Sequence, residues 1–411
     1  MTIKNRFPDV APVLNLDFAN TKRLDPRITF TRASTGTYVD EFGIVRTAAS
    51  NGARFDHDSD RNSLGLLVEE SRTNLQTYSE DFSQWTITVS NSTPGASVST
   101  NFATAPDGTT TADKFIPVNE SFNYIRRGTI TASNWSLTVY MKAAGMDYGQ
   151  IAVGTAGNVR FDLANGTVVT QTNATGQIQA LANGWYRCTL VKTGFTSTTE
   201  FRIFPGDNSS SSQITTADGV KGILIWGAQA ENATFATSYI PTSGSTATRS
   251  AEVANMTGTN FSSWYNQSEG TAVVKYKFLS QLQFTSPFAF RASTGVDAAS
   301  WGYWTYTGGS QVRVPSFGKR TPNEANFLLG TFFTLDTNRY YTVAVAQSGL
   351  SMSGCIETGT TQPLAITAMT TMNVLNFGWI RSTATPMTGH IARLAYYDRR
   401  LTDAQLQALT L

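Results

Sequence analysis

Apolar and polar residues alternate with a period of two in many short stretches of this chain. The clearest stretch is WSLTVYMK, residues 135–142. Successive side chains of a strand point to opposite faces, so the pattern predicts a strand whose first face lies in a core and whose second face is wet or semi-wet. The first face carries Trp135, Leu137, Val139 and Met141, and the second carries Ser136, Thr138, Tyr140 and Lys142.

Turn signals separate these stretches at close intervals. Asn165-Gly166 lies between the apolar runs FDL and TVV, and Asn183-Gly184 precedes the alternating run WYRCTLV. Asn-Gly between two apolar runs is a strong hairpin signal, because both residues tolerate a positive φ. Many short strands with close turns and no sustained helical period predict an all-β fold of antiparallel jelly-roll sandwiches.

One stretch, residues 222–252, organises the rest of the chain. It begins as a strand, with Ile223 and Ile225 on one face and Leu224, Trp226 and Ala228 on the other. It then becomes rich in Gly, Ser, Thr and Pro, and we expect residues 241–253 to form a surface connection. The predicted units are an N-terminal attachment and packing arm at 1–74, a sandwich at 75–250 and a second sandwich at 251–411.

The C-terminal end predicts a short helix. Thr402 and Gln405 have the spacing of a capping box, and Leu401 and Leu406 stand where a hydrophobic staple packs. Leu406 and Leu409 lie one turn apart, which gives the helix a single apolar edge to dock on the preceding strands.

Composition excludes several classes of protein. Charged residues are 15% of the 411, the formal net charge is +2, and Lys and Arg never cluster beyond a pair, so we expect no nucleic-acid partner. The first residues lack the apolar segment of a signal peptide, and no apolar run could span a bilayer, so we expect synthesis in cytosol and no membrane insertion. Cys188 and Cys355 fall in different predicted units, and we expect both thiols to be free.

Several phrases resemble structural proteins of tailed bacteriophages. LDFANTKRLDPRITFTRASTGTYVDEFGIVRTAASNGARFDHD and GLLVEESRTNL resemble the entry arm of head-spike or tail-fibre proteins. APDGTTTADKF, NGWYRC and WGAQAENATFATSYIPT look like the carbohydrate-binding-module-like jelly roll that recurs in phage fibres. MTGHIARLAYYDRRLTDAQLQALT resembles the closing strand and helix of laminin-G-like or concanavalin A-like jelly rolls. The resemblance implies a virion protein that is exposed on the particle surface.

Catalytic and metal-binding patterns are weak. Asp56, Asp58 and Asp60 alternate like calcium ligands, but Arg61 replaces the required glycine and Leu67 stands at the glutamate position. The two histidines, His57 and His390, fall in different regions, which argues against a zinc site or a triad. Glu69 and Glu70 would point to opposite faces of a strand and would not cooperate. We therefore expect no metal, no cofactor, no catalytic residues and no enzyme activity.

Aromatic residues supply the binding candidates. In residues 301–306, alternation places Trp301 and Tyr303 on one face of a strand and Trp304 and Tyr306 on the other. Both pairs cannot lie in the core of a two-layer sandwich, so one pair would be covered by a sugar ring or by a protein partner. We assign Trp301, Tyr303, Trp304, Tyr306 and Arg313 as carbohydrate or interface candidates.

The leading hypothesis is a phage head or tail fibre, or spike, that adheres to glycans of the host surface. The arm would bind phage head or tail proteins, and the chain would form a homo-oligomer, with a trimer expected by analogy with phage fibres. No heptad repeat occurs, so association would use sheet faces and the arm. The alternatives are a capsid decoration protein without a ligand and a glycan-active enzyme with binding modules.

Overall fold

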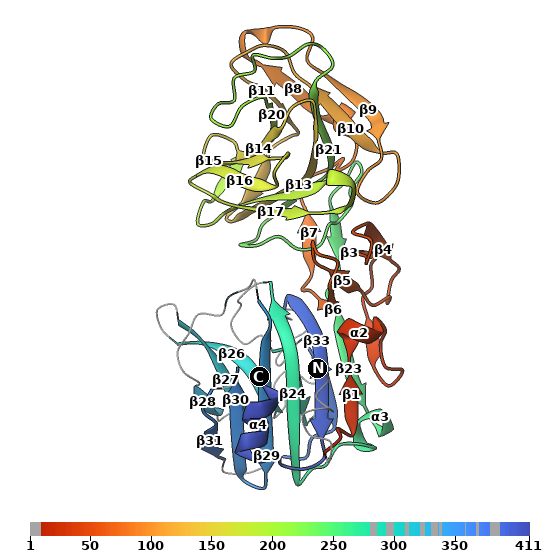
Figure 1. Ribbon diagram of the computed structural model, residues 1–411, viewed down its shortest axis with the longest axis vertical. Coiled ribbons are helices and arrows are strands. Elements are labelled where there is room, and N and C mark those ends of the chain that lie inside the picture. The colour runs from red at the N-terminus through yellow and green to blue at the C-terminus, as the bar shows by residue number, and fades with distance from the viewer. Residues whose placement is uncertain are drawn as a thin grey trace.

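The computed structural model describes residues 10–279, 286–292, 300–308, 312–320, 325–329, 336, 339–357, 359–366, 370–378 and 387–411. For residue 300 and residues 303–308, 312–320 and 325–329 it describes the backbone. The fold is all-β, as predicted, with antiparallel sheets that stack into two sandwiches (Figure 1). No helix in these residues is long and apolar enough to cross a membrane.

The middle sandwich consists of two six-stranded sheets, whose strands alternate along one continuous part of the chain. In spatial order, the first sheet contains β17 (Thr175–Ala180), β18 (Tyr186–Lys192), β13 (Trp135–Ala144), β21 (Gly222–Glu231), β10 (Ala112–Ile116) and β9 (Ser97–Ala103). The second contains β16 (Thr167–Thr172), β15 (Gly157–Asp162), β14 (Tyr148–Val153), β20 (Phe201–Gly206), β11 (Asn123–Arg126) and β8 (Thr86–Val89). The apolar faces of the two sheets meet in one core.

The predicted hairpins are confirmed. β15 and β16 pair around Asn165-Gly166, and Gly166 has a φ of 68°. Asn183 and Gly184, in the short 3₁₀ turn η3 (Ala182–Gly184), have φ values of 57° and 75° and connect β17 to β18. Positive φ at these positions explains why Asn and Gly occur there.

The second face of β13 is buried except at Lys142, which is half-buried, and this corrects the expectation of a wet or semi-wet face. Its core face holds Trp135 and Leu137 as predicted, but Thr138 and Tyr140 on the other face are also enclosed. The ring of Tyr140 packs at 5.2 Å from the ring of Trp226 and 5.9 Å from that of Tyr239. Alternation could not indicate this because the covering segments come from distant parts of the chain.

A bulge in β21 changes the face of Ala228. The register with β13 shifts beside Gly227, which has a φ of 65°. A bulge inserts one residue and moves the residues that follow to the other face. Ala228 therefore packs in the core with Ile223 and Ile225, whereas it was expected beside Leu224 and Trp226.

The second sandwich is assembled from both ends of the chain. Sheet A runs β31 (Gln362–Ala365), β30 (Ser351–Ile356), β29 (Tyr341–Ser348), β24 (Glu269–Phe278), β33 (Gly389–Tyr397), β6 (Ser63–Val68) and β5 (Phe55–His57), with β1 (Leu14–Leu16) also paired to β33. Sheet B runs β2 (Thr29–Thr31), β23 (Val253–Thr257), β32 (Val374–Phe377), β25 (Phe288–Arg291), β26 (Ser300–Gly308), β27 (Val312–Arg320) and β28 (Ala325–Leu329). One core lies between them.

The sequence predicted an attachment and packing arm at 1–74, and the described strands of this segment pack mainly into the second sandwich. They contribute β1, β5 and β6 to sheet A and β2 to sheet B. The hairpin of β3 (Gly36–Val39) and β4 (Val45–Ala48) instead reaches the middle sandwich, where Val45 N donates to Pro106 O. The ribbon of β7 (Arg72–Asn74) and β22 (Ala247–Arg249) connects the two lobes (Figure 1).

Short helices and small strands complete the described fold. They are α2 (Phe18–Thr21), α3 (Thr259–Ser262), α4 (Asp403–Leu409), the 3₁₀ turns η1 (Phe82–Gln84) and η2 (Ser90–Ser92), and the pair β12 (Ile130–Ala132) and β19 (Ser197–Thr199).

The predicted C-terminal helix is confirmed in detail. Thr402 caps α4, and its side chain and that of Gln405 form the capping box. Leu401, Leu406 and Leu409 are buried against the outer face of sheet A. An isolated helix of seven residues is not stable in water, so α4 depends on this packing. Each docked leucine stabilises it by removing apolar surface from water.

Candidate functional site

Trp301 lies in the core of the second sandwich. Its ring centroid is 4.5 Å from that of Phe290, and Nε1 donates a 2.9 Å hydrogen bond to the hydroxyl of Tyr265. This ring is therefore enclosed by its own chain. The backbones of Tyr303, Trp304 and Tyr306 lie in β26 and that of Arg313 in β27, but their side chains lie outside the described residues, so their proposed role stays a prediction.

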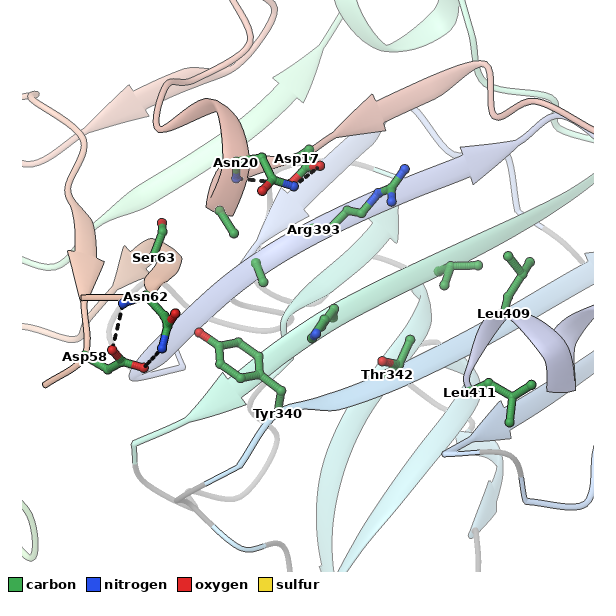
Figure 2. Close-up of a pocket in the computed structure, with 14 residues that line it drawn as sticks. Asp17, Asn20, Asp58, Asn62, Ser63, Tyr340, Thr342, Arg393, Leu409 and Leu411 are labelled. Atoms are coloured by element: carbon green, nitrogen blue, oxygen red, sulfur yellow. Dashed lines mark hydrogen bonds between the residues drawn. The ribbon is translucent and has the colours of Figure 1, made fainter. Parts of the chain in front are cut away.

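A groove of about 520 Å³ crosses the outer face of sheet A (Figure 2). Strands β24, β29 and β33 supply its floor, and two helices packed on the same sheet bound it. α4 packs on β29 and β30, whereas α2 packs on β6 and β33. We call this the sheet A groove. Its lining side chains are Asp17, Ala19, Asn20, Asp58, Asn62, Ser63, Val273, Lys275, Tyr340, Thr342, Ala392, Arg393, Leu409 and Leu411.

A turn between β5 and β6 forms one end of the groove. Asp58 Oδ1 accepts hydrogen bonds from the backbone N–H of Asp60 at 2.9 Å and of Asn62 at 2.8 Å, and Oδ2 accepts from the side-chain amide of Asn62. Arg61 adopts a φ of 67° inside this turn. The carboxylate thus organises the turn that the sequence analysis weighed as a calcium loop, and it holds the Asn62 amide at the groove.

The short helix α2 forms another side of the groove. Asp17 caps this helix and accepts a 2.7 Å hydrogen bond from the side chain of Asn20. On β33, Arg393 Nε donates to Asn15 Oδ1 at 2.9 Å. The Nη groups of Arg393 have no hydrogen bond to a residue that the structure describes, so they can donate to a ligand.

Tyr340 contributes the aromatic surface of the groove (Figure 2). Its hydroxyl donates a 2.6 Å hydrogen bond to the carbonyl of Leu64, and the ammonium of Lys275 lies 5.6 Å from the ring centroid. Burial, with further contributions from the charges of Asp56 and Asp58, raises the pKa of the Tyr340 hydroxyl well above its ordinary value. The phenol therefore stays neutral, and the ring is fixed from both its tip and its face.

A buried ionic cluster joins the two lobes. Arg54 Nη2 lies 2.8 Å from Glu69 and 2.5 Å from Glu252. Arg32 pairs with Glu252 at 3.0 Å, and Arg249 pairs with Glu69 at 3.1 Å. We call these five residues the junction cluster. All are fully enclosed. Charges buried in this way are tolerated only when paired and hydrogen-bonded, so the cluster strongly favours one arrangement of these segments.

The opposite charges of the cluster shift one another's pKa values. Burial opposes charge on Glu69, but the guanidinium groups of Arg249 and Arg54 hold its pKa well below its usual range. Burial likewise opposes charge on Arg54, but Glu252 and Glu69 raise its pKa. The cluster extends toward the middle sandwich, because Ser238 donates to Glu69 through both its backbone N–H and its hydroxyl.

The junction cluster corrects one expectation about the connection at 241–253. Arg249 and Glu252 of that segment are buried, although its composition predicted a surface connection. Small polar residues dominate the segment, and its two charged side chains fold inward onto opposite charges. Glu69 and Glu70 have separate partners, since Glu70 binds Arg72. This agrees with the prediction that the two carboxylates do not cooperate.

The fold brings the two histidines onto the same sheet. His390 Nε2 lies 3.1 Å from Asp56 Oδ2. His57 follows Asp56 in the sequence, and its Nδ1 contacts the carbonyl of Val39. Their separation of more than 300 positions concealed this arrangement. In the parts of the chain that the structure describes, no three His, Cys, Asp or Glu side chains gather as metal ligands. Both cysteines are free and buried, as predicted.

A second concavity, of about 840 Å³, lies on the middle sandwich where it faces Leu279 of the other lobe. Side chains of β17 and β18 line it, including Gln177, Gln179 and Thr189, together with Phe235. Arg187 in this concavity donates to the carbonyl of Thr237. We call it the interlobe concavity.

Comparisons with known proteins give weak structural likeness. No protein-family profile and no curated protein matches the sequence. Among solved structures, a carbohydrate-binding module of Ruminococcus gnavus IT-sialidase bound to α2,3-sialyllactose has 16% identity and a TM-score of 0.28, covering 37% of this chain and 88% of its own. Domain 4 of the arabinanase AbnA from Geobacillus stearothermophilus, in complex with arabinotriose, has 14% identity and a TM-score of 0.30, covering 39% and 73%.

A Trypanosoma rangeli sialidase in complex with the inhibitor DANA matches over more of this chain. It has 10% identity and a TM-score of 0.27, covering 76% of this chain and 55% of its own. At these TM-scores the likeness carries no argument about function, which must come from the residues themselves.

Sequence reasoning missed the sheet A groove. Its lining residues come from three separated parts of the chain, near residues 17–20, 58–63 and 273–411. The one available signal was the polar run around Asp58 and Asn62, whose Asp and Asn content marked an organised turn. Tyr340 gave no signal, because the adjoining Tyr341 has the same chemistry but lies in the core.

Proposed function

We propose that this chain is a glycan-binding structural protein of a phage virion, a head or tail fibre or spike that adheres to glycans of the host surface without acting on them. The observation that carries glycan binding is the sheet A groove, in which one fixed aromatic ring lies among side chains of both charges and amides.

The aromatic ring suits the apolar side of a sugar. A pyranose presents C–H groups on its face, and these pack on the face of a tyrosine ring. Tyr340 is held by its hydrogen bond to Leu64 and by the nearby Lys275, so it loses little freedom when a ligand binds. The groove therefore offers a preformed surface for stacking.

The polar side chains suit hydroxyl groups. A hydroxyl both donates and accepts, so its binding site needs acceptors and donors together. Asp17 and Asp58 accept, Lys275 and Arg393 donate, and Asn62 does both. The two acidic and two basic side chains balance, which favours a neutral saccharide. The volume of about 520 Å³ falls within the usual range for small-ligand sites.

The carboxylates of the groove support binding without catalysis. Glycoside hydrolysis needs two carboxylates free to act on the glycosidic bond. In the groove, Asp17 caps α2 and Asp58 accepts the backbone hydrogen bonds of the β5–β6 turn, so both carboxylates already hold local structure. This favours an adhesive protein over the alternative of a glycan-active enzyme.

The virion role is supported by the sequence resemblance to phage head-spike and tail-fibre proteins. We retain attachment to head or tail proteins through the first 74 residues, exposure on the particle surface and a trimeric state. A trimer is tested by light scattering at micromolar concentration, where a monomeric mass would refute it. The alternative is a decoration protein without a ligand, which the glycan-binding test below distinguishes.

Glycan-array binding by the full chain, followed by calorimetry with each bound glycan, tests the proposal. We expect Tyr340→Ala to weaken binding at least about tenfold, equivalent to about 1.4 kcal/mol, because the stacking surface is lost. Phe102→Ala is the matched control, since Phe102 is an exposed ring of the middle sandwich. No binding to any glycan would favour the decoration protein, and release of reducing sugar would favour the enzyme.

A further inference from the structure

The outer face of the second sheet of the middle sandwich carries aromatic and cationic side chains that the sheet A groove does not use. We propose that it is a second binding site, for a saccharide that bears a carboxylate. The site shares with the proposed function only the assumption that the occupant is a saccharide. We call it the aromatic patch, made of Phe122, Tyr124, Phe204, Arg126 and Arg202.

The strand register places these side chains together. β11 and β20 are antiparallel, with Ile125 opposite Ile203 and Arg126 opposite Arg202. The two isoleucines point into the core, so the residues on either side of them point outward. Tyr124 and Phe204 therefore stand next to each other on the outer face, with the two arginines beyond them.

The aromatic rings form a short row. The centroid of Tyr124 is 4.9 Å from that of Phe204 and 5.7 Å from that of Phe122. Phe122 is 36% exposed, Tyr124 is half-buried and Phe204 is nearly enclosed. The spacing of the rings is close to the length of one sugar unit, and their exposure decreases from one end of the row to the other.

The charges beside the row favour an anion. Arg126 Nη1 lies 2.5 Å from one oxygen of Glu200, and Arg202 Nε lies 2.8 Å from the other. Two guanidinium groups share one carboxylate, which leaves an excess of one positive charge. The Nη groups of Arg202 have no hydrogen bond to any residue that the structure describes, and the guanidinium lies 4.8 Å above the Tyr124 ring. This fixed fork matches a carboxylate.

The size of the patch favours a saccharide over a protein partner. A stable protein interface buries roughly 800 Å² on each partner. The patch offers three rings, of which Phe122 is the most exposed. One ring for stacking beside one anion-binding fork suits a pyranose that carries a carboxylate, such as a sialic or uronic acid.

The test is calorimetry of the full chain with 3′-sialyllactose and trigalacturonic acid, with lactose as the neutral probe. We expect at least one acidic probe to bind at least about tenfold more tightly than lactose at about 50 mM salt, and less tightly at about 200 mM, because salt screens the charge. Equal binding of acidic and neutral probes, or no binding, would overturn the proposal.

Variants locate the site. Arg202→Gln should remove the preference for the acidic probe, and Phe122→Ala should weaken its binding without affecting the fold, because Phe122 is exposed. Arg46→Gln, which removes a surface arginine paired with Asp40, is the matched control. It should change neither the preference for the acidic probe nor the affinity for it. Unchanged acidic preference in Arg202→Gln would refute the site.

The variants distinguish the two proposed binding sites. Tyr340→Ala should leave the acidic probe bound, since Tyr340 lies in the other lobe. If Tyr340→Ala abolishes acidic binding and Arg202→Gln does not, the saccharide binds in the sheet A groove; this outcome supports the proposed function and overturns the aromatic patch.

Discussion

The two sandwiches differ in how the chain builds them. The middle sandwich takes its strands from one continuous stretch, β8 to β21, whereas the second sandwich combines β1, β2, β5 and β6 with strands that begin at β23. The junction cluster lies where the two pieces of the second sandwich meet. Both pieces also line the sheet A groove, through Asp58 from the first and Tyr340 from the second. The proposed glycan site therefore depends on the sandwich with the longer-range contacts.

The largest expected effect comes from separating the pieces. A fragment of residues 72–249 keeps both sheets of the middle sandwich and the β7–β22 ribbon, so it should unfold cooperatively on heating. A fragment of residues 252–411 lacks four strands and should show no cooperative transition. Residues 1–74 alone should not fold either, because their apolar side chains pack on strands from the rest of the chain. Circular dichroism melts would check all three, and cooperative folding of 252–411 would contradict the comparison.

Breaking the junction cluster should have the next largest effect. Glu252 accepts hydrogen bonds from Arg32, Arg54 and the backbone of Glu69. Glu252→Gln leaves buried cations with one fewer counter-charge, which should lower the free energy of unfolding by about 3–5 kcal/mol. Denaturant unfolding measures this. Glu41→Gln, at an exposed pair with Lys22, is the control and should leave stability unchanged. A Glu252 variant as stable as the parent would refute the structural role of the cluster.

A smaller effect should be confined to the second sandwich. Thr402→Ala removes the cap of α4, which should cost about 1 kcal/mol. Hydrogen exchange should become faster in α4 and remain unchanged in β13 of the middle sandwich. Thr198→Ala is a control, because Thr198 is an exposed threonine of the middle sandwich. Faster exchange in both lobes would show that they unfold together.

The smallest effect concerns pH and the middle sandwich. Burial raises the pKa of Asp113 to about 6 in the folded chain, above its ordinary value near 3.8. The folded state then binds more protons than the unfolded state between these values, so this group contributes stability at low pH that is lost as pH rises through about 6. Asp113→Asn should remove that dependence. Urea unfolding at several pH values from 4 to 7 checks it, and an identical pH profile in both proteins would contradict the assignment.

Local patterns predicted local structure well. The hairpin at Gly166, the turn at Gly184 and the capping box at Thr402 each depend on a few adjacent residues, and all three were correct. The all-β class followed from the same alternation. The sequence could not indicate which strands pair across long separations, because alternation fixes the face of a strand and not its neighbour.

The proposed binding surfaces depend on strand pairing across long separations, which the sequence could not indicate. The sheet A groove joins Asp17, Asp58 and Tyr340, whose proximity follows from the integration of the N-terminal strands. The aromatic candidates at 301–306 came from a local pattern, and the structure places Trp301 in the core. The proposed roles of Tyr303, Trp304, Tyr306 and Arg313 stay predictions. The aromatic patch required the pairing of β11 with β20, which lie far apart in sequence.

The central claim is that a glycan binds in the sheet A groove, between residues from both ends of the chain. Hydrogen exchange of the full chain, with and without the tightest neutral glycan from the array, tests it most directly. We predict that bound glycan slows exchange in peptides covering 58–63, 340–342 and 392–393, and that Tyr340→Ala abolishes this protection. Protection confined to β17 and β18, in the interlobe concavity, would contradict the account.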